Sequence, residues 1–231
     1  MMLEDTAPML RALLFDLDGT LIDTAPEIAL ALNRTLRWLG RPEADDDTVR
    51  GWIGDGARAL LEKALGGPAT DAVWERFSYE YEAACGEASQ LYPGVRSMLE
   101  RLHARGIKLA VLTNKEARFA HKLLALHDIT SHFDLLVAGD SLPVKKPHPG
   151  VVSHALAALD VQAVDAAFVG DSLTDLRTAR AAGVRAWLVT HGYPNGEFQG
   201  ADAPDAWIGR FADFDPVEGD HAPASPLRRI H

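Results

Sequence analysis

Cysteine is almost absent from this sequence. Cys85 is the single cysteine among 231 residues, so no disulfide framework can form within the chain. Proteins without such a framework are typical of reducing compartments, and we therefore expect a cytoplasmic location. The polar surroundings of Cys85, EAACGEAS, give no support to a reactive thiol.

Long apolar runs and concentrated positive charge are lacking too. No stretch approaches the roughly 18 apolar residues of a membrane-spanning helix, and the acidic start, MMLEDTAPML, has no long apolar region. Lysine and arginine are scattered rather than gathered in the basic stripe that neutralises the phosphates of a duplex. We expect neither a membrane nor a nucleic acid as partner.

The acidic excess restricts the small molecules that the protein could capture unaided. The formal net charge of −10 repels a small anion at long range. An anionic substrate would therefore depend on local cations or on a metal ion. With 47% hydrophobic residues, the chain has enough apolar material for a sizeable core.

Short aliphatic runs alternate with helical patterns over most of the chain. The runs that indicate buried strands are ALLF (12–15), IKLAVLT (107–113), DLLVAG (134–139), AAFVG (166–170) and VRAWLV (184–189). Helical patterns lie between the later runs, near 115–127, 148–160 and 173–182. Near-continuous apolar strands separated by helices predict an α/β fold, a doubly wound parallel sheet covered on both faces.

The interval between the first two predicted strands is too long for a simple crossover. It holds about ninety residues, whereas a crossover needs about a dozen or more. Helical patterns near 26–38, 56–65 and 70–84 predict an inserted helical cap domain over 24–92. It opens with TAPE, in which Thr24 and Glu27 have the spacing of a capping box and Pro26 suits the first turn.

The other boundaries follow from this insert. The main domain is predicted as a Rossmann-like core built from 1–23 and 93–214. The last segment, 215–231, is rich in proline, alanine and charge and has no core pattern. We expect it to be a flexible tail.

Polar side chains follow the predicted strands at the points where the strands end. In chain order they are Asp16 and Asp18, Thr113 and Asn114, Lys145 and Lys146, Asp171 and Ser172, with Asp175 one helical turn further on. The carboxyl ends of parallel strands share one edge, and open α/β sheets bind their ligands there. The sequence therefore predicts a single site at this edge.

Each of these residues has an ordinary structural explanation when it is taken alone. Aspartate, threonine and asparagine often cap helices or form turns, and adjacent lysines are usually solvated. Their joint occurrence at successive strand ends favours a site. Clustered carboxylates raise one another's pKa unless a cation is present, and oxygen ligands without histidine or cysteine favour Mg²⁺ beside a substrate phosphate.

A site of this kind suits phosphoryl transfer. One carboxylate could attack phosphorus and form an aspartyl-phosphate, while a metal, a lysine and a hydroxyl hold the phosphoryl oxygens. Another could protonate the leaving alcohol and then activate water. Asp16 and Asp18 can meet one substrate where the chain bends after the strand, and Gly19 allows that bend.

Four motifs, DLDGTLIDT, LTN, KKPHP and GDSLTD, resemble in order and spacing those of the haloacid dehalogenase superfamily of phosphatases. The resemblance covers roughly residues 11–190 and includes a helical insert where that family carries its cap. It implies that Asp16 is the nucleophile and Asp18 the acid/base. It also implies that Thr113 and Lys146 bind the phosphoryl group. Lys146 is selected over Lys145 because the family lysine precedes proline.

The resemblance further implies a metal site and contacts to the substrate. Mg²⁺ would be held by Asp16, the backbone carbonyl of Asp18 and Asp171, with Asp175 as a supporting carboxylate. Within the same motifs we expect substrate contacts from Gly19, Asn114 and Ser172.

Two details narrow the branch of this superfamily. Dehalogenating relatives lack the second aspartate, so Asp18 favours phosphoester chemistry, and sugar-phosphate mutases often carry another residue where Thr20 stands. The stretch VRGWIGDGARALLEKAL (49–65) resembles the cap of bacterial phosphoglycolate phosphatases. In that stretch Gly54 could offer backbone N–H groups to an anion, and Arg50 or Arg58 could supply a forked cation, although each has an equally good structural explanation.

The sequence thus predicts a Mg²⁺-dependent phosphatase of a small phosphomonoester, with 2-phosphoglycolate as the leading substrate. A phosphatase of another small metabolite, such as a sugar phosphate, and a phosphosugar mutase of the same superfamily remain alternative functions. A phospho-aspartate receiver fits poorly because receivers lack a large helical insert. An inactive scaffold also fits poorly, because every polar group expected of a catalytic site is present. The oligomeric state stays open between monomer and homodimer.

Overall fold

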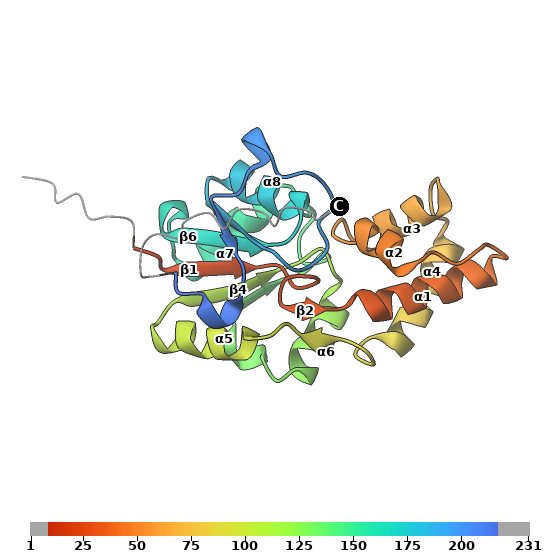
Figure 1. Cartoon of the computed structure of the whole chain (residues 1–231), viewed down its shortest axis with the longest axis horizontal. Helices are drawn as coiled ribbons and strands as arrows, with labels where there is room; N and C mark the ends of the chain where they lie inside the picture. The colour runs from red at the N-terminus through yellow and green to blue at the C-terminus, as the bar shows by residue number, and fades with distance from the viewer. Residues whose placement is uncertain (1–8, 217–231) are drawn as a thin grey trace, which may run out of the picture.

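A six-stranded parallel sheet forms the centre of the larger part of the molecule in the computed structural model, which describes residues 9–216 (Figure 1). All five pairs of neighbouring strands run parallel. Across the sheet the strands follow the order β5 (Leu135–Val137), β4 (Lys108–Leu112), β1 (Ala12–Phe15), β6 (Ala166–Gly170), β7 (Arg185–Val189) and β8 (Ala206–Ile208). The expected α/β fold with a doubly wound parallel sheet is confirmed.

The strands are apolar because both faces of the sheet are covered. Every residue of β1 is buried. Leu13 and Phe15 belong to the core on one face, and Ala12 and Leu14 to the core on the other. A continuous aliphatic run, rather than an alternating one, is what a strand buried on both faces requires.

Two pairs of helices cover the two faces. Buried side chains of α5 (Val95–Ala104) and α6 (Ala117–Leu126) join the first core, and those of α7 (Gly150–Leu159) and α8 (Leu173–Ala182) join the second. Short 3₁₀ helices also occur in the described chain, at Thr130–His132, Ala163–Asp165, Gly200–Asp202 and Phe211–Asp213. None of the helices within residues 9–216 has both the length and the apolar character that crossing a bilayer requires.

A helical insert lies between β1 and β4 and extends away from the sheet (Figure 1). It contains α1 (Ala25–Trp38), α2 (Asp46–Trp52), α3 (Ala57–Leu65) and α4 (Asp71–Ala84). A two-stranded antiparallel ribbon, β2 (Ile22–Asp23) with β3 (Gln90–Leu91), joins it to the sheet. The chain therefore leaves and re-enters the sheet domain side by side.

Several elements are not among those predicted from the sequence. These are α2, α5, β8 and the β2–β3 ribbon. Strands of two or three residues have too few positions for a period to show, and α2 is only seven residues long. Its start did carry a signal, because Asp45 accepts a hydrogen bond from the Thr48 N–H at 2.8 Å and two further aspartates follow in the first turn.

The capping box predicted at the start of α1 is wrong. Thr24 occupies the cap position, but its side chain makes no cap hydrogen bond and instead donates to Asp18 at 2.6 Å. Glu27 accepts hydrogen bonds from the Tyr81 hydroxyl and the Gly86 N–H. The Tyr193 hydroxyl accepts from the N–H groups of Thr24 and Ala25, so the helix start has a tertiary partner.

The tail expected over 215–231 lies mostly outside the described residues. Asp215 is within them and forms an ion pair with Arg105.

Candidate active site

The predicted side chains come together at the carboxyl ends of the central strands. Asp16 follows β1, Thr113 follows β4 and Asp171 follows β6. β1 lies between β4 and β6, so the chain passes to opposite sides of the sheet at this point. A crevice forms at such a switch point because the connections on either side diverge.

Three buried carboxylates form the centre of the site. Oxygens of Asp16, Asp171 and Asp175 all lie within 4.8 Å of one another. The Lys146 ammonium is 2.7 Å from both Asp16 and Asp175. One lysine therefore pairs with two of the three acidic groups.

This excess of negative charge shifts the protonation equilibria. Burial is the main cause that raises the pKa of Asp16 to about 7, Lys146 opposes the shift, and Asp175 adds to it. Burial and the neighbouring carboxylates also raise the pKa of Asp171 well above its ordinary value. Burial disfavours the Lys146 ammonium, but Asp16 and Asp175 more than compensate and raise its pKa.

The donor set fits a hard divalent cation. All the clustered ligand atoms are carboxylate oxygens, which Mg²⁺ prefers, and a cation would relieve the repulsion among them. Asp171 is oriented by the Thr20 hydroxyl at 2.8 Å and the Tyr193 N–H at 2.7 Å. Asp16 and Asp171 are therefore the carboxylates best placed to hold a metal ion.

Asp175 is more heavily engaged than the other two carboxylates. One oxygen contacts Lys146, and the other accepts hydrogen bonds from the Asp171 N–H, the Ser172 N–H and the Ser172 hydroxyl. Ser172 and Asp175 form a complete capping box at the start of α8. The Ser172 hydroxyl is thus used in the helix cap, and Asp175 anchors the loop that carries Asp171.

A tight turn brings the second aspartate back toward the first. Gly19 has φ +82°, a conformation that favours glycine, and a Cβ there would lie 2.4 Å from a carboxylate oxygen of Asp171. Asp16 and Asp18 consequently line the same cavity. The bend that Gly19 was expected to allow is present.

Asp18 has two polar partners that the sequence analysis did not connect with it. The Thr24 hydroxyl donates to it at 2.6 Å, and the Lys115 ammonium lies 2.8 and 3.0 Å from its two oxygens. Lys115 directly follows the LTN motif. Its position after β4 is the only feature of the sequence that could have indicated a role for Lys115 in the site.

Asn114 holds the loop that carries Lys146. Its side-chain amide donates to the carbonyl groups of Gly54 and Lys146, and its carbonyl oxygen accepts from the Lys146 N–H at 3.0 Å. Thr113 is buried beside it, and its hydroxyl oxygen accepts from the Lys115 N–H. Lys146 is buried and Lys145 exposed, so the two neighbouring lysines differ sharply in surroundings.

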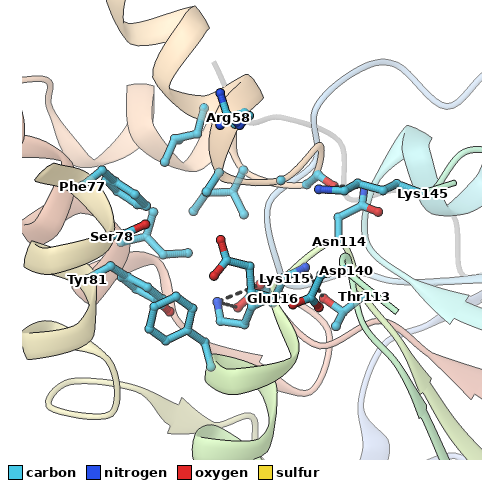
Figure 2. A pocket seen from close by; sticks show the side chains of 18 of the residues that line it. Arg58, Phe77, Ser78, Tyr81, Thr113, Asn114, Lys115, Glu116, Asp140 and Lys145 are labelled. Carbon is cyan, nitrogen blue, oxygen red and sulfur yellow. Dashed lines mark hydrogen bonds and ion pairs between the residues drawn. The ribbon is translucent and has the colours of Figure 1, made fainter. Parts of the chain in front are cut away.

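A cavity of about 330 Å³ opens between these residues and the helical insert (Figure 2). Gly54 and Arg58 of the insert line it, as do Asp16, Asp18 and Thr113. Its apolar wall comes mainly from the insert and includes Ile28, Ile53, Leu60, Trp74 and Phe77. The cavity therefore has a polar floor on the sheet and an apolar wall on the insert.

Arg50 does not line this cavity. Its guanidinium group lies 3.3 Å from Asp23 in the ribbon and 5.1 Å from the centre of the Tyr193 ring. Burial disfavours the Asp23 carboxylate, but hydrogen bonds from Tyr193 and Arg50 hold its pKa below the ordinary value. Arg50 thus contacts the connection between sheet and insert.

The fold and this site define a class of protein. The sequence model of the family described as haloacid dehalogenase-like hydrolase matches residues 13–189. The chain belongs to this family, and the expectation of a phosphatase of the haloacid dehalogenase type is confirmed.

Individual relatives agree with that class. The chain is 41% identical over 198 residues to a phosphoglycolate phosphatase of Colwellia psychrerythraea, covering 81% of this chain and 87% of the relative. A phosphoglycolate phosphatase of Yersinia pestis is 38% identical, with 91% of this chain and 94% of the relative covered. The crystal structure of a predicted phosphoglycolate phosphatase from Haemophilus somnus superposes with a TM-score of 0.79 at 32% identity, over 88% and 96% of the two chains.

Proposed function

We propose that this protein hydrolyses 2-phosphoglycolate to glycolate and inorganic phosphate with the aid of Mg²⁺. The observation that carries the proposal is the placement of the Asp16 carboxylate beside Asp171 and 2.7 Å from Lys146, at the carboxyl end of β1. The names of the relatives support the choice of substrate. The single cysteine, which is buried, supports a cytoplasmic location.

The proposed reaction has two steps. In the first, an oxygen of Asp16 bonds to phosphorus, the bond from phosphorus to the ester oxygen breaks, and Asp18 gives its proton to the departing alkoxide. In the second, Asp18 removes a proton from water, the water oxygen attacks phosphorus, and Asp16 is released as a carboxylate. Inorganic phosphate leaves last.

The remaining groups bind and orient the phosphoryl group. Thr113 and Lys146 would contact its oxygens and stabilise the charge that they carry in the transition state. Mg²⁺ held by Asp16, Asp171 and the backbone carbonyl of Asp18 would supply further positive charge beside the phosphate. Asp175 would keep Lys146 and the Asp171 loop in place through the hydrogen bonds described above.

The helical insert is proposed to act as a cap over this site. On this proposal residues 24–92 form the cap and residues 1–23 and 93–214 form the core. Two contacts between them support it, because Asn114 donates to the Gly54 carbonyl at 3.0 Å and Thr174 donates to Asp55 at 2.6 Å. A cap that closes in this way excludes bulk water during the reaction.

The decisive experiment replaces the proposed nucleophile. In Asp16→Asn, we expect phosphate release from 2-phosphoglycolate in the presence of Mg²⁺ to fall by about 10³-fold or more, because the amide cannot form the intermediate. Asp160→Asn, at the exposed end of α7, is the matched control and should retain activity. Full activity of Asp16→Asn would reject the assignment. A series of phosphorylated sugars assayed in parallel tests the choice of substrate.

A further inference from the structure

The position of the substrate's carboxylate is restricted by the chemistry of the proposed function, on which this inference rests. In 2-phosphoglycolate one methylene group separates the carboxylate from the ester oxygen that Asp18 protonates. The group that recognises the carboxylate must therefore lie close to Asp18. A cation suits this role best, because the chain carries a formal net charge of −10 that repels an anion at long range.

Among the described residues that line the cavity, three are cationic: Arg58, Lys115 and Lys145. Lys145 is exposed. The Arg58 side chain is 53% exposed, lies against the Trp74 ring and pairs with Asp71 on the insert. Only Lys115 among these three cations is hydrogen-bonded to Asp18, at 2.8 and 3.0 Å.

Lys115 is held at this position by its surroundings. Its side chain is only 6% exposed, and its ammonium lies 4.9 Å from the centre of the Tyr81 ring, a favourable place for a cation. An ammonium has three N–H donors. Within residues 9–216 the hydrogen bonds of this group are the two to Asp18, which leaves one donor for a ligand.

The carboxylates next to Lys115 along the cavity floor are already engaged. Glu116 accepts from Arg118 at 2.9 Å, and Asp140 accepts from the Ala117 N–H at 2.8 Å. Figure 2 shows Lys115, Glu116 and Asp140 on the floor, below Arg58, with Phe77 and Tyr81 on the left of the view. Lys115 thus has a far less exposed side chain than Arg58 and lies at the junction of the reacting centre and the open part of the cavity.

We propose that Lys115 determines the substrate class by binding the carboxylate of a phosphomonoester whose carboxylate is one carbon away from the ester oxygen. The ammonium would bridge this carboxylate and Asp18, so that the leaving group is placed with its ester oxygen toward the proton donor. A substrate with an apolar group at that point would leave the third donor without a partner.

The test compares two esters of similar size. Ethyl phosphate carries a methyl group where 2-phosphoglycolate carries its carboxylate. In Lys115→Met, the ratio of kcat/KM for 2-phosphoglycolate to that for ethyl phosphate should fall by about 10- to 100-fold, the usual effect of losing a charged hydrogen bond. Lys115→Arg should restore part of the ratio. Lys145→Met and Arg58→Met are the matched controls and should preserve it.

Equilibrium binding gives a second measurement that does not depend on turnover. With Asp16→Asn as background, the Kd of 2-phosphoglycolate should rise by a similar factor when Lys115→Met is added. An unchanged ratio together with an unchanged Kd would overturn the role of Lys115, as would a collapse of the ratio in Arg58→Met instead. If the unaltered protein hydrolyses ethyl phosphate but not 2-phosphoglycolate, the proposed function itself fails.

Discussion

At the scale of the residue, the site depends on a close approach that only glycine allows. Gly19 has a positive φ, and its α-carbon faces the Asp171 carboxylate and the Tyr193 ring. Gly19 directly follows Asp18, which lines one cavity together with Asp16. The position of Asp171 in the acidic cluster therefore depends on the absence of a side chain at Gly19.

We expect Gly19→Ala to be destabilising and to impair catalysis. The new Cβ would lie 2.4 Å from Asp171 and 2.8 Å from Tyr193 in a backbone conformation that alanine disfavours, so about 1–3 kcal/mol of stability should be lost. Gly40→Ala is the control, because Gly40 also has a positive φ but a Cβ added there would meet nothing within 4 Å. Urea unfolding and phosphate release measure the two effects. Equal losses in both variants would contradict the steric explanation.

At the scale of the element, the loop after β7 connects the site to the insert. The Tyr193 N–H orients Asp171, and the Tyr193 hydroxyl accepts from two N–H groups at the start of α1 and donates to Asp23. Asp23 in turn pairs with Arg50 of α2. One tyrosine thus contacts the acidic cluster, the ribbon and the first helix of the insert.

We expect Tyr193→Phe to lower the free energy of unfolding by about 1–3 kcal/mol. The phenyl ring leaves the buried N–H of Thr24 without its acceptor and leaves the Ala25 N–H with only its longer hydrogen bond to Asp23, at 3.3 Å. An unpaired buried N–H group is costly. Tyr79→Phe is the control, since the Tyr79 side chain is exposed on α4. Urea unfolding of the two variants and the parent protein gives the comparison. An effect no larger than that of Tyr79→Phe would show that the start of α1 does not depend on this hydroxyl.

The length and apolar character of the elements explain which helices and strands could be predicted from the sequence. The predicted strand at 12–15 and the predicted helices at 26–38, 70–84 and 173–182 match β1, α1, α4 and α8 to within one residue at each end. These segments are long or continuously apolar, so their local pattern is strong. The ribbon and β8 form from two or three residues each, and their pairing partners, not their own sequences, make them strands.

At the scale of the whole molecule, the contacts between sheet domain and insert define the cavity. The loop before α3 reaches Asn114 on one side and Thr174 on the other. The apolar core of the insert is also continuous with the sheet face that α5 and α6 cover. If the insert moves as a cap, the loop contacts must break while the shared core near the ribbon persists.

Cross-linking these two parts tests that movement. Cysteines introduced as Asp55→Cys and Thr174→Cys, in a Cys85→Ala background, can be joined by a short cleavable reagent. We expect turnover to fall at least about tenfold while the link is present, because substrate exchange requires opening. Cleavage of the link should restore the rate, and the unlinked variant serves as control. Undiminished turnover of the fully linked protein would argue against a moving cap.

The sequence alone determined the class of fold and the set of residues at the strand ends. Aliphatic runs and helical periods are local properties, and parallel strands bring their carboxyl ends to one edge whatever their order along the chain. From these two facts the clustering of Asp16, Thr113, Lys146 and Asp171 could be predicted. The structure places all four at that edge.

Only the tertiary structure decided which polar groups pair with one another. Lys115 meets Asp18 across 97 positions of sequence, and Tyr193 meets Thr24 across 169. Thr24 and Glu27 have the spacing of a local capping box, yet both bind partners from elsewhere in the chain. Contacts between segments so far apart leave no local pattern, because they depend on how helices and strands pack and not on the period of any one of them.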